Sequence, residues 1–346
     1  MKYIDIAFAI DENYIVQCAT TMVSILKNTH TKYKLRFHIL CEKVNGKMNK
    51  LFDLQSIKDF ELYFYEVTLD KISKFPLSMH WISRTTYYRF LLPTVLPIEI
   101  EKCIYLDCDL ICMQDIESLW SYDIDNYLAG AVNDIAASMY NKRLGRPQES
   151  AYFNAGVLLL NLKNLREFDF LKMCEEYYES KKECITAQDQ DILNGVLCDS
   201  WLQLPLIYNI CTPLYQKITL YYQELDFSTR TEIIENPAIV HFTGIYKPWL
   251  SFVNHPFRDK YIEFESYTPY KIEYYFMLLK QLLRRVFRIE KYQNGKNCKT
   301  KDIYIFNFKI FSYYRCRFAV KIIFFSALKY RRLKNRYRKM KKLSFV

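Results

Sequence analysis

Short apolar segments alternate along most of the chain with segments in which apolar residues recur every three or four positions. The first apolar segment covers residues 4–10, and the apolar residues from Ile15 to Leu26 then share one helical face. Further strands are expected at 35–41, 61–67, 104–107, 128–132, 156–161 and 237–242, and further helices at 83–92, 168–178 and 189–198. This alternation predicts a doubly wound, mainly parallel α/β sheet, in which ligands bind beyond the carboxyl ends of the strands.

The pattern changes after about residue 268, where Tyr, Phe, Lys and Arg dominate. From residue 271 to the end there are 22 Lys and Arg against 3 Asp and Glu, whereas the preceding residues carry 27 against 35. In this basic, aromatic tail, one helical face is predicted to carry Phe311, Tyr314, Phe318, Ile322 and Phe325. The tail is interpreted as an anchor on an anionic membrane surface. A charged helix packed on the domain and a nucleic-acid-binding segment are the alternatives.

Composition adds two expectations. The 11 cysteines are scattered without the spacing of a zinc site, which indicates reduced thiols and a cytoplasmic protein. The start of the chain does not resemble a signal peptide, and no run of 18 uncharged apolar residues predicts a spanning helix.

Two acidic residues, Asp107 and Asp109, interrupt the apolar run 103–111. In extended backbone, residues two apart point to the same side, so both carboxylates could face one cation. An ionised carboxylate inside a sheet needs a positive partner, and a hard divalent ion that also holds phosphate oxygens would supply one. The alternative is a strand end at which both acids are solvated.

Other polar clusters leave similar alternatives open. Asp11, Asn13 and Tyr14 follow the first strand, where they could cap a helix or bind a nucleoside. The run 153–156 could be a tight turn or a loop that approaches a sugar, and the run 187–191 could simply be an acidic helix start. His241 and Lys247 flank a glycine-containing turn and could complete a metal shell and hold a phosphate.

Taken together, six motifs in this order resemble glycosyltransferase family 8, in particular its bacterial lipopolysaccharide galactosyl- and glucosyltransferases, which are related to glycogenin. The motifs lie at residues 8–14, 85–89, 105–109, 153–157, 188–194 and 241–249, and the resemblance covers roughly residues 3–265. It implies a GT-A nucleotide-sugar transferase fold for a catalytic domain at residues 1–267, followed by the basic aromatic helical tail at 268–346. It also implies Mn²⁺ (or Mg²⁺) dependence and a UDP-galactose or UDP-glucose donor.

The resemblance assigns expected roles to individual residues. The metal ligands are Asp107, Asp109 and His241. The uridine pocket is formed by Ala9, Asp11, Asn13 and Tyr14, and the diphosphate contacts by Gly244 and Lys247. The donor-sugar contacts are Arg89, Asp134, Asn154, Ala155, Asp189 and Gln190, of which Gln190 corresponds to the residue nearest the anomeric carbon.

These expectations describe a retaining hexosyltransferase at the inner face of the cytoplasmic membrane, with a glycolipid acceptor of the lipopolysaccharide or lipooligosaccharide core and no nucleic-acid partner. The amide of Gln190 is a poor nucleophile, so attack by the acceptor on the front face stands beside a covalent intermediate. A glycogenin-like enzyme that glucosylates itself, and a non-catalytic protein that binds nucleic acid or membrane through its basic tail, remain alternatives. Nothing in the sequence distinguishes galactose from glucose.

Overall fold

The computed structural model describes residues 2–75, 83–134, 138–147, 149–198, 200–215, 225, 227–245, 247–250, 253–270, 287–293, 298–305, 308–316 and 319–324. The chain divides into two units, Met1–Lys271 and Ile272–Val346, and each is described by itself.

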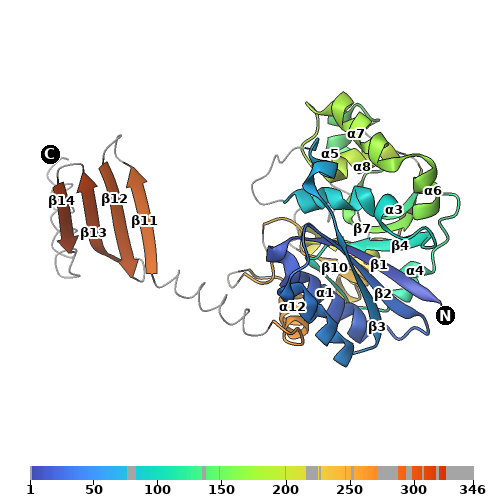
Figure 1. Cartoon of the computed structure of the whole chain (residues 1–346), viewed down its shortest axis with the longest axis horizontal. Helices are drawn as coiled ribbons and strands as arrows, with labels where there is room; N and C mark the ends of the chain where they lie inside the picture. Colours follow the sequence, from blue (N-terminus) through green and yellow to red (C-terminus); the bar gives the residue numbers. More distant parts are fainter. Residues whose placement is uncertain are drawn as a thin grey trace. The chain divides into compact units, whose positions relative to one another are not determined.

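A seven-stranded sheet forms the centre of the first unit (Figure 1). Its order is β3 (Phe60–Glu66), β2 (Lys34–Cys41), β1 (Tyr3–Ile10), β4 (Lys102–Leu106), β7 (Phe153–Asn161), β6 (Ala129–Asn133) and β8 (Trp201–Leu204). Strands β3, β2, β1 and β4 are parallel to one another, β7 runs antiparallel to both β4 and β6, and β6 is parallel to β8. The predicted α/β architecture with a mostly parallel sheet is therefore confirmed.

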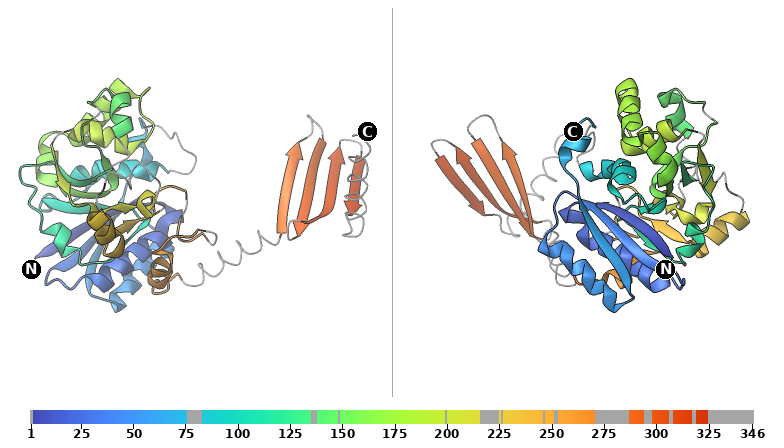
Figure 2. Two further views of the ribbon diagram at one scale, coloured as in Figure 1. Left: turned by 180° about the vertical axis from the view of Figure 1, so that it is seen from behind. Right: turned by 45° about the vertical axis from the view of Figure 1, so that its right-hand side comes forward.

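Helices cover both faces of this sheet (Figures 1 and 2). One face packs against α1 (Ile15–Asn28) and α12 (Arg258–Glu265), and the other against α3 (Leu92–Val95), α6 (Leu162–Glu167), α7 (Phe170–Lys181) and α8 (Asp189–Leu197). Strand β1 shows why two layers form, because Ile6 and Phe8 belong to the first core and Ala7 between them belongs to the second.

Shorter elements complete the described part of the first unit. The short helices are α2 (Gly46–Asn49), α4 (Glu117–Trp120), α5 (Ser138–Leu144), α9 (Thr212–Tyr215) and α11 (Phe227–Glu235). The 3₁₀ turns are η1 (Glu12–Tyr14), η2 (Lys50–Ser56), η3 (Leu69–Ile72), η4 (Arg84–Leu91) and η6 (Leu206–Tyr208).

A small second sheet brings distant segments together. It has the order β5 (Leu110–Cys112), β10 (Ile239–His241) and β9 (Ile210–Cys211), with β10 antiparallel to β5 and parallel to β9. In this register His241 lies opposite Leu110 on one side and Cys211 on the other. The sheet therefore places His241 directly beside the acidic segment that follows β4.

Three details of the first unit differ from the sequence predictions. The helical segment that begins after Ser83 continues past Pro93, which lies in the first turn of α3, where the missing N–H has no partner to lose. The run 153–156 belongs to β7 instead of a turn or loop before it. Asp107 and Asp109 lie in a bend after β4 and not inside a strand.

The second unit contains an antiparallel sheet of four strands where a helix was expected. Its strands are β11 (Phe287–Gln293), β12 (Cys298–Ile305), β13 (Phe308–Cys316) and β14 (Ala319–Phe324), in that order. Phe311 pairs with Phe324 and Tyr313 with Ile322, whereas the predicted face residues Phe318 and Phe325 lie outside the described residues. Aromatic and β-branched residues pack well on a pleated surface, which explains the preference for strands. Across the described ranges, every helix is too short or too polar to cross a lipid bilayer.

Candidate active site

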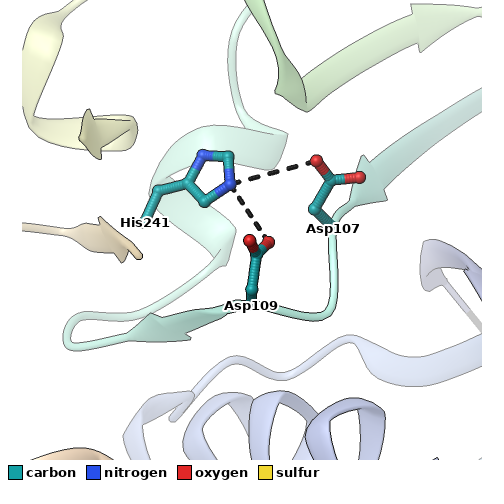
Figure 3. A group of neighbouring side chains, drawn as sticks. All are labelled: Asp107, Asp109 and His241. Carbon is teal, nitrogen blue, oxygen red and sulfur yellow. Dashed lines mark hydrogen bonds and ion pairs between the residues drawn. The ribbon is translucent and has the colours of Figure 1, made fainter. Parts of the chain in front are cut away.

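Asp107, Asp109 and His241 converge at the carboxyl end of β4 (Figure 3). Nε2 of His241 lies 3.1 Å from Oδ1 of Asp109 and 3.9 Å from Oδ2 of Asp107, and one ligand atom from each residue falls within 4.8 Å of the others. The backbone holds this bend in place, since Asp107 N–H donates to Gly156 O (2.8 Å) and Phe242 N–H donates to Asp109 O (2.9 Å). Two carboxylates and one imidazole in this arrangement can hold a divalent cation.

The backbone of Gly156 lies close to the side chains of His241 and Asp107. A Cβ atom at this position would lie 2.2 Å from Cε1 of His241 and 2.9 Å from Oδ2 of Asp107. No side chain fits in that space without displacing two of the three converging groups. The glycine in the motif at 153–157 thus permits a close approach of backbone to the candidate metal ligands.

Positive charges surround the two carboxylates. Lys247 is ion-paired with Asp109, and Nη2 of Arg89 lies 2.8 Å from Oδ1 of Asp107. Burial alone would raise the pKa of Asp109, but the charges of Lys247 and His241 outweigh burial and hold that pKa well below its usual range. Asp109 is therefore ionised at neutral pH and is ready to bind a cation.

Arg89 also links the acidic bend to the start of α8. Its Nη1 lies 3.1 Å from Oδ2 of Asp189 and donates to Ala155 O at 2.6 Å, and the hydroxyl of Thr86 donates to Oδ1 of Asp189 at 2.7 Å. Burial raises the pKa of Asp189, and the charge of Arg89 opposes that shift. Arg89 is only 4% exposed, and its guanidinium thus joins two carboxylates inside the site.

A cavity of about 460 Å³ opens over these groups. Of the predicted site residues, those lining it are Ala9, Tyr14, Arg89, Asp107, Asp109, Asn154, Ala155, Asp189, Gln190, His241, Gly244 and Lys247. It is also lined by residues that the sequence analysis did not assign individually, namely Ser83, Thr85, Thr86, Tyr105, Cys108, Gly156, Ala187, Thr243 and Ile245. Its size and mixed lining suit a small polar ligand.

Three predicted residues lie apart from this cavity lining. Asp11 accepts a hydrogen bond from Asn13 N–H at 2.8 Å and so caps η1, as the alternative interpretation of that cluster expected. Asn13 is exposed. Asp134 lines a smaller neighbouring cavity of about 70 Å³, which shares Asn154 and Thr243 with the larger one.

Gln190 is held by the strand that it faces. Its Oε1 accepts hydrogen bonds from Nδ2 of Asn154 (3.0 Å) and from Ala155 N–H (3.2 Å). The residue that follows, Asp191, is fully buried and accepts hydrogen bonds from Arg143, Tyr152 and two backbone N–H groups. Asp191 therefore has a structural role, and it fixes the first turn of α8 from which Asp189 and Gln190 project.

Asn209, which follows η6 and is 2% exposed, was not among the residues predicted from the sequence. Its side chain contacts both Nδ1 of His241 and Oδ1 of Asn154, each at 2.9 Å. An isolated asparagine between two apolar residues gives no periodic or motif signal, so only the folded chain shows this contact.

Comparisons with known proteins agree with this geometry. Residues 5–252 match the family model "Glycosyl transferase family 8". General stress protein A of Bacillus subtilis is 29% identical over 264 residues, 75% of this chain and 92% of its own length. A lipopolysaccharide 1,2-glucosyltransferase of Escherichia coli K12 is 28% identical over 263 residues, 73% of this chain and 75% of its own length.

A solved structure supports the same conclusion. The galactosyltransferase LgtC, determined in complex with donor and acceptor sugar analogues, superposes with a TM-score of 0.69 at 28% identity and covers 77% of this chain and 96% of its own. The fold, the converging acidic and imidazole groups and the match over residues 5–252 lead to one conclusion: this chain is a glycosyltransferase and belongs to glycosyl transferase family 8.

Proposed function

We propose that the chain transfers galactose or glucose from a UDP-sugar, with retention at the anomeric carbon, to the core of a lipopolysaccharide or lipooligosaccharide. The observation that carries the proposal is the convergence of Asp107, Asp109 and His241 within 4.8 Å at the floor of a cavity that also contains Asp189 and Gln190. A cation-binding group next to hydroxyl-binding side chains suits a hexose that is bonded to a nucleoside diphosphate. The glucosyl- and galactosyltransferase activities named for two relatives support the choice of hexose.

The donor set fits Mn²⁺ or Mg²⁺. Two carboxylates and one imidazole would hold the ion and leave its remaining positions for phosphate oxygens. When bound, the ion supplies Lewis-acid stabilisation of the diphosphate leaving group. Lys247, whose side chain is 17% exposed and pairs with Asp109, would add a second positive charge for the same phosphates.

The nucleoside and the sugar are proposed to occupy opposite ends of the cavity. Tyr14 lines the cavity and is proposed to mark the nucleoside end; the ring of Trp249 meets it edge-on, with centroids 6.2 Å apart. Burial raises the pKa of Tyr14, so its ring stays neutral and available to stack on a base. At the other end, Arg89 and Asp189 are placed to hold and orient sugar hydroxyl groups.

The hydrogen bonds of Gln190 favour front-face attack over a covalent intermediate. Its carbonyl oxygen, the only nucleophilic atom of the amide, already accepts two hydrogen bonds. Those bonds draw electron density away from the oxygen and tie it to β7. The acceptor hydroxyl is proposed to approach from the small cavity lined by Asp134 and Thr243, next to Asn154.

The basic tail is proposed to hold the enzyme at the inner face of the cytoplasmic membrane, beside its glycolipid acceptor. From residue 271 onward the chain carries 22 basic and 3 acidic residues, which supports this role. Each basic residue near anionic lipid contributes about 1 kcal/mol to membrane binding. A chain ending at Lys271 should lose binding to anionic liposomes. Tight binding of an oligonucleotide by the full chain, with none to liposomes, would support a nucleic-acid role in its place.

Hydrolysis of a panel of nucleotide sugars with Mn²⁺ and no acceptor tests the enzymatic proposal. We expect turnover of UDP-galactose or UDP-glucose that is lost with EDTA and in Asp109→Ala. Turnover by Asp109→Ala in the presence of EDTA would show that the metal assignment is wrong, and turnover of none of the UDP-hexoses would contradict the donor assignment.

A further inference from the structure

A chain of side-chain hydrogen bonds joins the candidate metal site to the candidate sugar site. It runs from Nδ1 of His241 to Oδ1 of Asn209 (2.9 Å), from Nδ2 of Asn209 to Oδ1 of Asn154 (2.9 Å), and from Nδ2 of Asn154 to Oε1 of Gln190 (3.0 Å). Its members come from four separate segments of the fold. Asn209 is the only link between His241 and the other amides in the described part of the chain.

The orientation of each amide follows from backbone groups, whose donors are unambiguous. Gly156 N–H donates to Asn154 at 3.0 Å, so the atom of Asn154 on that side is oxygen. Ala155 N–H donates to Gln190 at 3.2 Å, so the atom of Gln190 on that side is oxygen as well. Nδ2 of Asn154 must then face Gln190.

The same reasoning fixes Asn209. Because Oδ1 of Asn154 accepts from backbone, Asn209 must present its NH₂ group to Asn154 and its oxygen to His241. The reversed amide would oppose two oxygen atoms at 2.9 Å inside a buried site, which is strongly unfavourable. Nδ1 of His241 therefore carries a proton, and Nε2 is the nitrogen directed at Asp109 and Asp107.

This arrangement is the one that a metal-binding imidazole requires, with one nitrogen as ligand and the other as donor to a fixed acceptor. We propose that Asn209 is a positioning residue that holds the proton on Nδ1 of His241, so that Nε2 is the nitrogen left for a metal ion, and that, through Asn154, it aligns Gln190 with the metal site. The inference rests on the proposed function for its metal and sugar. Its geometric part, the proton on Nδ1, depends on neither.

Two substitutions separate the links. Asn209→Leu removes both hydrogen bonds. Asn209→Asp keeps an acceptor for Nδ1 of His241 but has no donor for Asn154. Asn161→Leu is the matched control, because Asn161 is also a buried asparagine, 6% exposed, whose side chain bonds to Ile124 O and to Asn164 N–H, two residues that do not line the cavity.

The first readout is the protonation of the imidazole in the metal-free, ¹⁵N-labelled full-length protein. Long-range ¹H–¹⁵N spectra should show a proton on Nδ1 of His241, assigned through its loss in His241→Gln. The signal should persist in Asn209→Asp and in Asn161→Leu and disappear in Asn209→Leu. An unprotonated Nδ1 in the wild type would overturn the proposal.

The second readout is calorimetric titration with Mn²⁺ alone, combined with UDP-sugar hydrolysis. Loss of such a partner typically weakens metal binding by roughly 10- to 100-fold, and we expect that loss for Asn209→Leu but not for Asn161→Leu. Asn209→Asp should bind Mn²⁺ at least as tightly as the wild type, while kcat falls about tenfold or more.

The outcomes distinguish this inference from the proposed function. If the wild type binds Mn²⁺ and Asn209→Leu binds it equally well, the positioning role is wrong and the metal assignment stands. If the wild type binds no Mn²⁺ but the Nδ1 proton is present and depends on Asn209, the proposed function is wrong. The hydrogen bond by which Asn209 orients His241 is then still supported.

Discussion

The ammonium group of Lys247 is ion-paired with Asp109, one of the two carboxylates that are proposed to bind the metal. Nζ of Lys247 also donates to Phe242 O at 2.7 Å, and the two side chains are 17% and 15% exposed. The protein thus already provides a positive charge at the place where a divalent cation would be bound. Lys247 pairs with Oδ2 of Asp109, whereas Oδ1 faces His241, so a cation bound at Oδ1 would compete with the ammonium group for the charge of one carboxylate. An ammonium group released by that competition is proposed to contact the diphosphate.

Replacing Lys247 should therefore change metal and nucleotide binding in opposite directions. In Lys247→Met, Mn²⁺ alone should bind about tenfold more tightly, because an ion-paired hydrogen bond contributes about 1.5 kcal/mol or more and no longer competes. With Mn²⁺ present, UDP should bind about tenfold more weakly. Calorimetry measures both constants, and Lys247→Arg, which keeps the charge, is the control. Weaker Mn²⁺ binding by Lys247→Met in the absence of UDP would contradict this competition.

Gly156 offers a test of site geometry without a change in charge. In Gly156→Ala, the new methyl group would overlap His241 and press on Asp107, so we expect Mn²⁺ affinity to fall at least tenfold. Gly46→Ala is the control, since a Cβ atom there has no neighbour within 4 Å. Mn²⁺ titration and thermal unfolding of both variants separate a local effect on the site from a loss of folding. Unchanged metal affinity in Gly156→Ala would show that His241 does not need its present position.

The sequence was sufficient to predict the parts of the site that local pattern controls. Asp107 and Asp109 stand out because they interrupt an apolar segment, and the structure places both beside His241. The prediction for their backbone was wrong, however, because the two acids lie after the end of β4 and not in an extended strand. Their convergence comes from the pairing of β10 with β5, which brings together residues more than 130 positions apart.

Asn209 shows what local pattern could not supply. Its partners are 32 and 55 residues away in the sequence, and nothing about a single asparagine indicates which carbonyl or imidazole it meets.

The secondary structure of the tail could not be predicted for a different reason. Its aromatic residues satisfy a helical period in part, but cross-strand pairs such as Phe311 with Phe324 depend on a register that periodicity alone does not specify.

Replacing Arg166 should lower the free energy of unfolding and leave metal affinity unchanged. Its guanidinium donates five hydrogen bonds to backbone carbonyl groups of the segment from Pro93 to Ile100, which leads into β4. Lysine has at most three donors, so Arg166→Lys should lower the free energy of unfolding by about 2–4 kcal/mol, at about 1 kcal/mol or more for each bond lost. Urea unfolding measures this difference, and Mn²⁺ affinity should not change. Lys172→Met, at an exposed ion pair with Glu176, should change stability by less than about 0.5 kcal/mol.

Glu265 should make the stability of the first unit depend on pH. This carboxyl group on α12 is 2% exposed, and within the described ranges its Oε2 has no hydrogen-bond partner. Burial raises its pKa to about 8 from 4.5, while the charge of Arg258 acts in the opposite direction. In the unfolded chain the group ionises at its ordinary pKa, so the folded state holds a proton that the unfolded state releases.

The sign of the effect follows from that difference. The free energy of unfolding should be highest below about pH 4.5 as far as this group is concerned, decrease as the pH rises towards 8, and change little above it. Each unit of pKa difference is worth about 1.4 kcal/mol. Glu265→Gln removes the ionisation, so the variant should gain stability relative to the wild type as the pH rises from 5 to about 8. Glu263→Gln, on the exposed side of the same helix beside Lys260, should leave the pH dependence unchanged. Thermal unfolding of the three proteins at pH values from 5 to 9 measures the effect, and parallel curves for the wild type and Glu265→Gln would show that this carboxyl group is not buried in its neutral form.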